Sequence, residues 1–208
     1  CDWSSDVCSS DLIAAGFAAQ DVSIVGPSSN PKNWNLVARY RGRGKAKPIL
    51  LMAHLDVVTA RPADWSIAPY ALTEKDGFLY GRGTSDQKNG CALLVASLIQ
   101  LKQEGVVPDR DLILALTAGE EGGIDYVGME WLVQNQRPLI DAEFAWNVDA
   151  GDPQHRELLF GFNAFGSRGH VQPARHVADA ADDGHAVVVA HDILDEGAVD
   201  LDLVEREA

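Results

Sequence analysis

The sequence predicts an α/β fold, a doubly wound and mostly parallel sheet with helices on both faces. Two short apolar runs, at residues 48–54 and 111–117, have the composition of buried strands, the first of them covered on both faces, and a further strand is expected at residues 143–148. Two longer segments are expected to form helices. Residues 87–104 lie between the first and second of these strands, and residues 126–135 lie between the second and third. This alternation of strands and helices is typical of sheets whose ligands gather beyond the carboxyl ends of the strands.

The first part of the chain, up to residue 54, is expected to contain a helix and three strands. In chain order they are a short alanine-rich helix at 12–20, a strand at 22–25, a Gly-Pro-Ser-Ser turn at 26–29 and a strand of alternating character at 35–41. The run PILLMAH at residues 48–54 is continuously apolar and short. It is expected to place His54 at its carboxyl end and Asp56 just beyond that end.

The middle of the chain is expected to begin with a hairpin at residues 71–80 that turns at Asp76 and Gly77. A glycine-containing loop follows and leads through Asp86 into the predicted helix at 87–104. The later predicted strands end close to acidic residues. Each acidic motif of interest therefore falls at the end of a strand or at the start of a helix.

His54 and Asp86 each allow two interpretations. A histidine followed by Asp56 suits a metal site, because a carboxylate can accept the far ring N–H and fix the tautomer; the same pattern also fits a structural histidine. Asp86 fits the N-cap of the following helix. It also fits a carboxylate that bridges two cations about 3.5 to 4 Å apart.

Glu120 and Glu121 are adjacent carboxylates at the end of an apolar strand, with glycines on both sides. Their mutual repulsion is relieved by a cation or by a raised pKa. When a cation binds one of them, the other can act as general base toward a water molecule that the cation makes more acidic. A solvated acidic turn is the alternative for an isolated pair. Asp149 adds a further oxygen at the end of the next predicted strand.

Taken together, one histidine and several carboxylates at successive strand ends favour two divalent metal ions. Zinc is expected first, with cobalt or manganese as alternatives.

Four segments, LLMAHLDVV, YGRGTSDQKNG, LTAGEEGG and NVDAGD, resemble the ordered motifs of the M20 metallopeptidase family. The resemblance covers about residues 20–164 and implies the family's zinc-peptidase catalytic fold. By this resemblance, His54 and Asp149 bind the first ion, Asp86 bridges both ions and Glu121 binds the second. The resemblance also implies that Asp56 orients His54 and that Glu120 is the general base. Trp65 is placed near the cleft entrance by the same resemblance.

The sequence departs from the family pattern in its last part. It lacks the late histidine of the second metal site, the Gly-Gly-His-Ser run and the smaller inserted domain that mediates dimerisation. The histidines His170, His176, His185 and His191 do not stand in the family's surrounding pattern. We therefore expect the chain to be the first part of a catalytic domain and to be inactive alone, and the parent protein to be a homodimer.

Three regions are expected along the chain. Residues 1–12 read as a non-native leader, residues 13–165 as a partial metallopeptidase catalytic domain, and residues 166–208 as an acidic and atypical tail. This tail holds ten acidic residues against three arginines. The abrupt change of composition after about residue 165, to alanine, valine, aspartate and histidine without aromatic residues, favours a shifted reading frame over a natural acidic tail.

Composition excludes several classes of function. The formal net charge of −14 argues against a nucleic-acid partner, because phosphate binding depends on clustered lysine and arginine. No apolar run approaches the roughly 18 residues of a membrane span. Three cysteines are too few for a disulfide framework, and they leave the cellular compartment undetermined.

The resemblance implies a hydrolase that cleaves amide bonds of dipeptides or N-acyl amino acids with metal-activated water. A desuccinylase or deacetylase of the same family is an alternative. A non-catalytic α/β binding module is the alternative from another class of function, and the Glu120-Glu121 pair argues against it, because a binding module needs no paired base and ligand.

Overall fold

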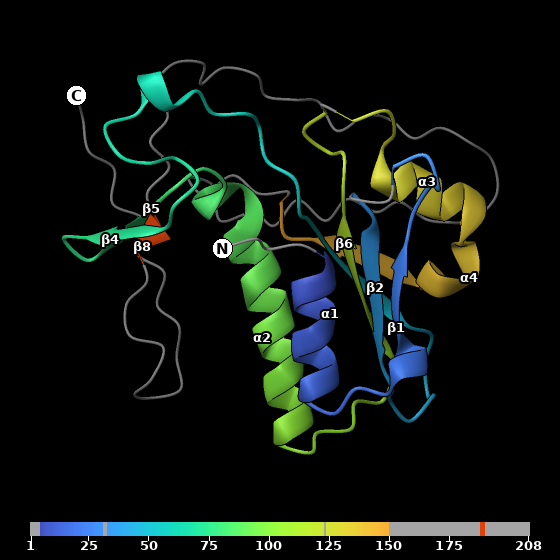
Figure 1. The fold of residues 1–208 in the computed structure, drawn as a ribbon. Coiled ribbons are helices and arrows are strands. Elements are labelled where there is room, and N and C mark those ends of the chain that lie inside the picture. The colour runs from blue at the N-terminus through green and yellow to red at the C-terminus, as the bar shows by residue number, and fades with distance from the viewer. Residues whose placement is uncertain (1–4, 31–32, 123, 150–187, 190–208) are drawn as a thin grey trace.

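The computed structural model describes residues 5–30, 33–122, 124–149 and 188–189 (Figure 1). Its main sheet has five strands in the order β1-β2-β6-β3-β7. Their bounds are Val22–Val25 for β1, Asn35–Tyr40 for β2, Ile49–His54 for β3, Leu112–Thr117 for β6 and Phe144–Asn147 for β7. Strand β3 pairs in parallel with β6 and β7, whereas β2 is antiparallel to both β1 and β6. The predicted α/β fold is confirmed, and its sheet is mixed.

Helices cover both faces of this sheet (Figure 1). Helices α1 (Ser5–Ala14) and α2 (Asn89–Gln103) lie on one face, and α3 (Gly128–Asn135) and α4 (Arg137–Ile140) lie on the other. Within the described ranges, no helix combines the length and the apolar character needed to span a membrane.

The central strand β6 shows why the buried strands read as continuous apolar runs. Leu114 and Leu116 pack into the core beneath α1 and α2 together with Leu98. The alternate residues, Ile113 and Ala115, pack into the second core together with Leu132 of α3 and Ile140 of α4. Both faces of the strand are therefore buried, and its one polar side chain, Thr117, lies at the carboxyl end.

The first helix does not lie where the sequence predicted it. The prediction of a helix at 12–20 is wrong: α1 ends at Ala14, and residues Ala19–Asp21 form a 3-10 turn. Gly16 stops the helix with a φ of 95°, a left-handed conformation that glycine adopts without strain. The Gly16 N–H donates to Ile13 and the Phe17 N–H donates to Leu12, which is the pairing of a Schellman cap.

Two smaller features lie close to their predicted positions. The predicted hairpin consists of β4 (Thr73–Lys75) and β5 (Phe78–Tyr80), and both turn residues have positive φ, 55° at Asp76 and 81° at Gly77. Such a turn matches the twist of the two strands.

Strand β8 (Val188–Val189) pairs with β5. Helix α2 begins at Asn89, two residues later than predicted, because Thr84–Lys88 form a separate wide turn.

The sheet edge at which the parallel strands begin is fixed by polar contacts around Asp111. This carboxylate accepts hydrogen bonds from Arg39 Nη1 at 2.9 Å and from the Gly42 N–H at 2.8 Å. Burial by itself raises the pKa of Asp111, but these two donors outweigh it and hold the pKa below its usual range.

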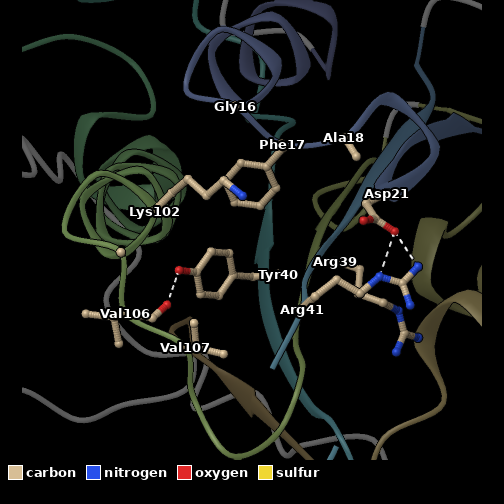
Figure 2. Close-up of a pocket in the computed structure, with 11 residues that line it drawn as sticks. Gly16, Phe17, Ala18, Asp21, Arg39, Tyr40, Arg41, Lys102, Val106 and Val107 are labelled. Carbon is tan, nitrogen blue, oxygen red and sulfur yellow. Dashed lines mark hydrogen bonds and ion pairs between the residues drawn. The ribbon is translucent and has the colours of Figure 1, made fainter. Parts of the chain in front are cut away.

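A cavity of about 230 Å³ lies at the same edge, beside the end of β2 (Figure 2). The Tyr40 hydroxyl lies within hydrogen-bond distance of the carbonyls of Leu101 and Val106, and the ammonium of Lys102 lies over the rings of Tyr40 and Phe17. These contacts join the last turn of α2 to β2.

We predict that Asp111→Asn lowers the free energy of unfolding by about 1 to 3 kcal/mol, because the Arg39 and Gly42 donors lose a charged acceptor. Because folding lowers the pKa of Asp111, its contribution is complete above the unfolded pKa of about 3.9 and is lost as the pH falls through the folded pKa. Denaturant unfolding between pH 2 and pH 7 (about the range of carboxylate titration) measures both effects.

Asp109→Asn is the matched control, because Asp109 is exposed and pairs only with exposed Arg43 and Lys45 among its described ion-pair partners. Such pairs contribute about 0 to 1 kcal/mol. An equal loss of stability in both variants would contradict the prediction.

Candidate metal centre

The site lies where three parallel strands end at one edge of the sheet. Strand register places His54 beside Thr117 of β6, and Met52 beside Asn147 of β7. The chain leaves β3 toward Asp56, β6 toward Glu120 and β7 toward Asp149. The ionisable residues therefore converge at the carboxyl edge, as the sequence predicted for such a sheet.

His54, Asp86 and Asp149 form a compact group of possible metal ligands. The Nε2 atom of His54 lies 2.9 Å from Asp86 Oδ1 and 3.6 Å from Asp149 Oδ2, and the three ligand atoms lie within 4.8 Å of one another. The His54 side chain is only 2% exposed. The group thus has a buried nitrogen donor facing two oxygen donors.

Asp86 does not act as an N-cap, which was the alternative interpretation of this residue. The N-cap of α2 is Lys88, and no side chain caps the helix there. The Asp86 carboxylate instead contacts His54, and this hydrogen bond is the main reason that the pKa of Asp86 lies below its usual range.

Asp56 connects His54 to the turn that carries the two glutamates. The Nδ1 atom of His54 lies 3.0 Å from the main-chain oxygen of Asp56 and 3.6 Å from its Oδ1. The Asp56 carboxylate accepts the N–H of Glu120 at 3.2 Å and the N–H of Glu121 at 2.9 Å. Burial raises the pKa of Asp56, but His54 and these amides outweigh burial and lower it.

The two glutamates differ in how they face the group. Glu120 Oε2 lies 3.9 Å from His54 Nε2, so this carboxylate points toward the ligand atoms. Glu121 lies outside the group formed by His54, Asp86 and Asp149. Burial raises the pKa of both glutamates, and the charge of Asp149 adds to the effect at Glu120 while that of Asp86 adds to it at Glu121.

His54 carries the positive charge that this arrangement requires. Burial lowers its pKa, but contacts with Asp56 and Asp86 and the charge of Asp149 outweigh burial and raise the pKa to about 10. The imidazole is therefore protonated at neutral pH, and its cation lies among the surrounding carboxylates. Carboxylates that stabilise a positive charge on His54 also suit a divalent metal ion, which would replace the imidazole proton.

A cavity of about 180 Å³ opens beside this group. His54, Glu120 and Asp149 line its polar side, and Met52, Val127 and Met129 are among its apolar lining residues. The space next to the candidate ligands is therefore polar on one side and apolar on the other.

Sequence reasoning missed two side chains at the start of α2. Lys88 Nζ donates to the main-chain oxygen of Leu55 at 2.9 Å, and Cys91 Sγ donates to that of His54 at 3.0 Å. Lys88 lies within the motif that contains Asp86, but nothing in the sequence indicates which distant carbonyl it contacts.

The profile of peptidase family M20/M25/M40 matches residues 50–201. The chain is 47% identical over 94 residues to a probable succinyl-diaminopimelate desuccinylase of Staphylococcus aureus strain Mu50, covering 44% of the chain and 23% of that protein. It is 42% identical over 109 residues to succinyl-diaminopimelate desuccinylase of Delftia acidovorans, covering 51% and 28%. The chain thus spans about a quarter of the length of these two relatives.

A solved structure, that of an M20 family metallo-carboxypeptidase from Sulfolobus solfataricus, shares the fold. It matches 72% of this chain and 33% of its own chain, with a TM-score of 0.60 and 20% identity.

We predict that Asp56→Asn loosens the turn at Glu120 and Glu121, because an amide side chain has only one oxygen to accept the two N–H groups. Hydrogen exchange at both amides is expected to accelerate, and the free energy of unfolding to fall by about 1 to 3 kcal/mol. Asp64→Asn is the control, since Asp64 is exposed and pairs with Arg61 on its own turn. Unchanged exchange at both amides would rule out this role of Asp56.

Proposed function

Since this chain belongs to peptidase family M20/M25/M40, we propose that the whole protein is a metal-dependent hydrolase that cleaves an amide bond in a small N-acylated amino acid. The observation that carries the proposal is the group of His54, Asp86 and Asp149, whose ligand atoms converge within 4.8 Å. Its position at the carboxyl ends of the parallel strands supports a catalytic site over an acidic surface turn.

The donor set fits zinc best among the divalent ions. Zinc accepts imidazole nitrogen together with carboxylate oxygen, and cobalt or manganese accepts the same set. His54, Asp86 and Asp149 would hold one ion, and Asp86 together with Glu121 would hold a second. Such ions, when bound, polarise the scissile carbonyl and make water a better nucleophile at neutral pH.

Glu120 is the general base of this proposal. Its carboxylate faces the ligand group, and burial raises its pKa above the usual value for glutamate. A raised pKa improves a carboxylate as a proton acceptor near neutral pH. Glu120 would take the proton of the attacking water and pass it to the nitrogen of the leaving amine. The Asp56 carboxylate would keep Glu120 in place by holding its main-chain N–H.

The relatives favour removal of an acyl group over cleavage of a dipeptide. Two proteins at 47% and 42% identity are named as desuccinylases of succinyl-diaminopimelate, an N-acylated amino acid. Peptide hydrolysis, which the family's name includes, is the second candidate.

We predict that the chain binds zinc and that His54→Ala weakens this binding by more than about 100-fold, beyond the 10- to 100-fold effect of residues that only support a ligand. Competition with a chromophoric chelator measures the affinity, and Asp149→Asn provides a second variant. Asp64→Asn is the control, because its exposed carboxylate pairs with Arg61. Equal affinity in all four proteins would exclude the proposed ligands.

In the whole protein, Glu120→Gln is expected to lower kcat by about 100- to 10,000-fold, because a carboxamide cannot accept the proton. Zinc affinity is expected to persist, since Glu120 is not among the proposed ligands. Steady-state hydrolysis of an N-succinyl amino acid, with bound metal assayed in the same samples, measures both. Glu130→Gln on α3 is the control. Normal turnover by the Glu120 variant would refute the mechanism.

A further inference from the structure

Two side chains from the start of α2 hold consecutive carbonyls of the segment that carries His54. Lys88 Nζ donates to the Leu55 carbonyl at 2.9 Å, and Cys91 Sγ donates to the His54 carbonyl at 3.0 Å. Leu55 and Cys91 are buried. A buried carbonyl that loses its donor costs about 1 to 3 kcal/mol, so these contacts constrain the segment.

Strand β6 holds the same segment from another direction. The Leu55 N–H donates to the Thr117 carbonyl at 2.7 Å, which continues the pairing of β3 and β6 by one residue. Both polar main-chain groups of Leu55 therefore have partners, one on β6 and one on Lys88. The peptide between His54 and Asp56 is fixed between the sheet and the beginning of α2.

Lys88 is also bound to the loop that carries Asp86. Its main-chain N–H donates to the Gly83 carbonyl at 2.8 Å, across the turn in which Asp86 lies. Lys88 thus contacts the loop of Asp86 through its main chain and the segment of His54 through its side chain. Among the contacts of the described residues, Lys88 therefore links the segment of His54 to the loop of Asp86. Nε2 of His54 and Oδ1 of Asp86 lie 2.9 Å apart.

We propose that Lys88 is a positioning residue that sets the separation of His54 and Asp86 by tying the Asp86 loop to the Leu55 carbonyl, an inference that rests on the proposed metal site. A zinc ion requires its nitrogen and oxygen ligands about 2.0 to 2.2 Å from the metal, so the two ligand atoms must stay within a narrow range of separation. Loss of the Lys88 contact releases that constraint and leaves the ligands themselves unchanged.

Lys102 provides a matched comparison on the same helix. It lies in the last turn of α2, and its ammonium lies over the rings of Phe17 at 5.9 Å and Tyr40 at 6.0 Å (Figure 2). These contacts are at the sheet edge opposite the candidate metal centre. Substitution of Lys102 by methionine removes an ammonium from the fold without touching the site.

The experiment compares zinc affinity in the wild-type chain, Lys88→Met, Lys88→Arg and Lys102→Met by competition with a chromophoric chelator. Methionine matches the four-atom apolar stem of lysine but has no donor, whereas arginine keeps a donor. Lys88→Met is expected to weaken zinc binding by about 10- to 100-fold, the usual effect of losing a group that supports a ligand. Lys88→Arg is expected to recover most of this loss, and Lys102→Met to bind as the wild type does.

A second readout needs no metal. Hydrogen exchange at the Leu55 amide is expected to accelerate in Lys88→Met and to stay unchanged in Lys102→Met. Should Lys88→Met fail to fold by circular dichroism, Lys88→Gln replaces it, because its amide is polar but too short to reach the Leu55 carbonyl.

The outcomes separate this inference from the proposed function. Zinc binding by Lys88→Met that equals the wild type would overturn the role of Lys88 and leave the metal centre standing. Equal weakening in Lys102→Met would overturn it also, because the effect would then be one of general stability. A wild-type chain that binds no zinc would overturn the metal centre and this inference together.

Discussion

The arrangement of the site depends on one positive charge among carboxylates at the carboxyl edge of the sheet. Asp56, Asp86, Glu120 and Asp149 all lie near the buried imidazole of His54. Such a set repels itself unless a cation lies within it. The proton on His54, whose pKa rises to about 10, supplies that cation in the chain alone, and a divalent ion would supply it more strongly.

The sheet makes this concentration of charge possible. Strand β3 lies between β6 and β7, and its side chains enter cores on both faces. The strand therefore cannot shift without disrupting apolar packing on two sides. Its last residue, His54, gains a fixed position from that packing, whereas the acidic residues lie on loops or turns beyond the strands. At this edge of the sheet, the rigid strand fixes the position of His54, and the loops and turns carry the acidic residues.

Sequence reasoning found the strands and the acidic residues more readily than the contacts between them. The strands around Leu50 and Leu114 are apolar up to their last residues, His54 and Thr117, because both faces are buried, and this makes such strands visible in a sequence. The helix predicted at 12–20 ends at Ala14 because Gly16 caps it in a left-handed conformation, an effect of local main-chain geometry. The hydrogen bond between Asp86 and His54 spans 32 positions and arises only from tertiary structure, so the spacing of residues could suggest it but not establish it.

Asp56 shows how one side chain can link the proposed base, Glu120, to the proposed metal ligands. Its carboxylate holds the amides of Glu120 and Glu121, while its main-chain oxygen contacts His54. Any movement of the glutamate turn is thereby transmitted to the segment that carries the imidazole. A cation bound at His54 and Asp86 favours the charged form of both glutamates, whose pKa values are otherwise raised by burial. Cation binding and the proton affinity of Glu120 are consequently coupled through charge, and their relative geometry is maintained by Asp56.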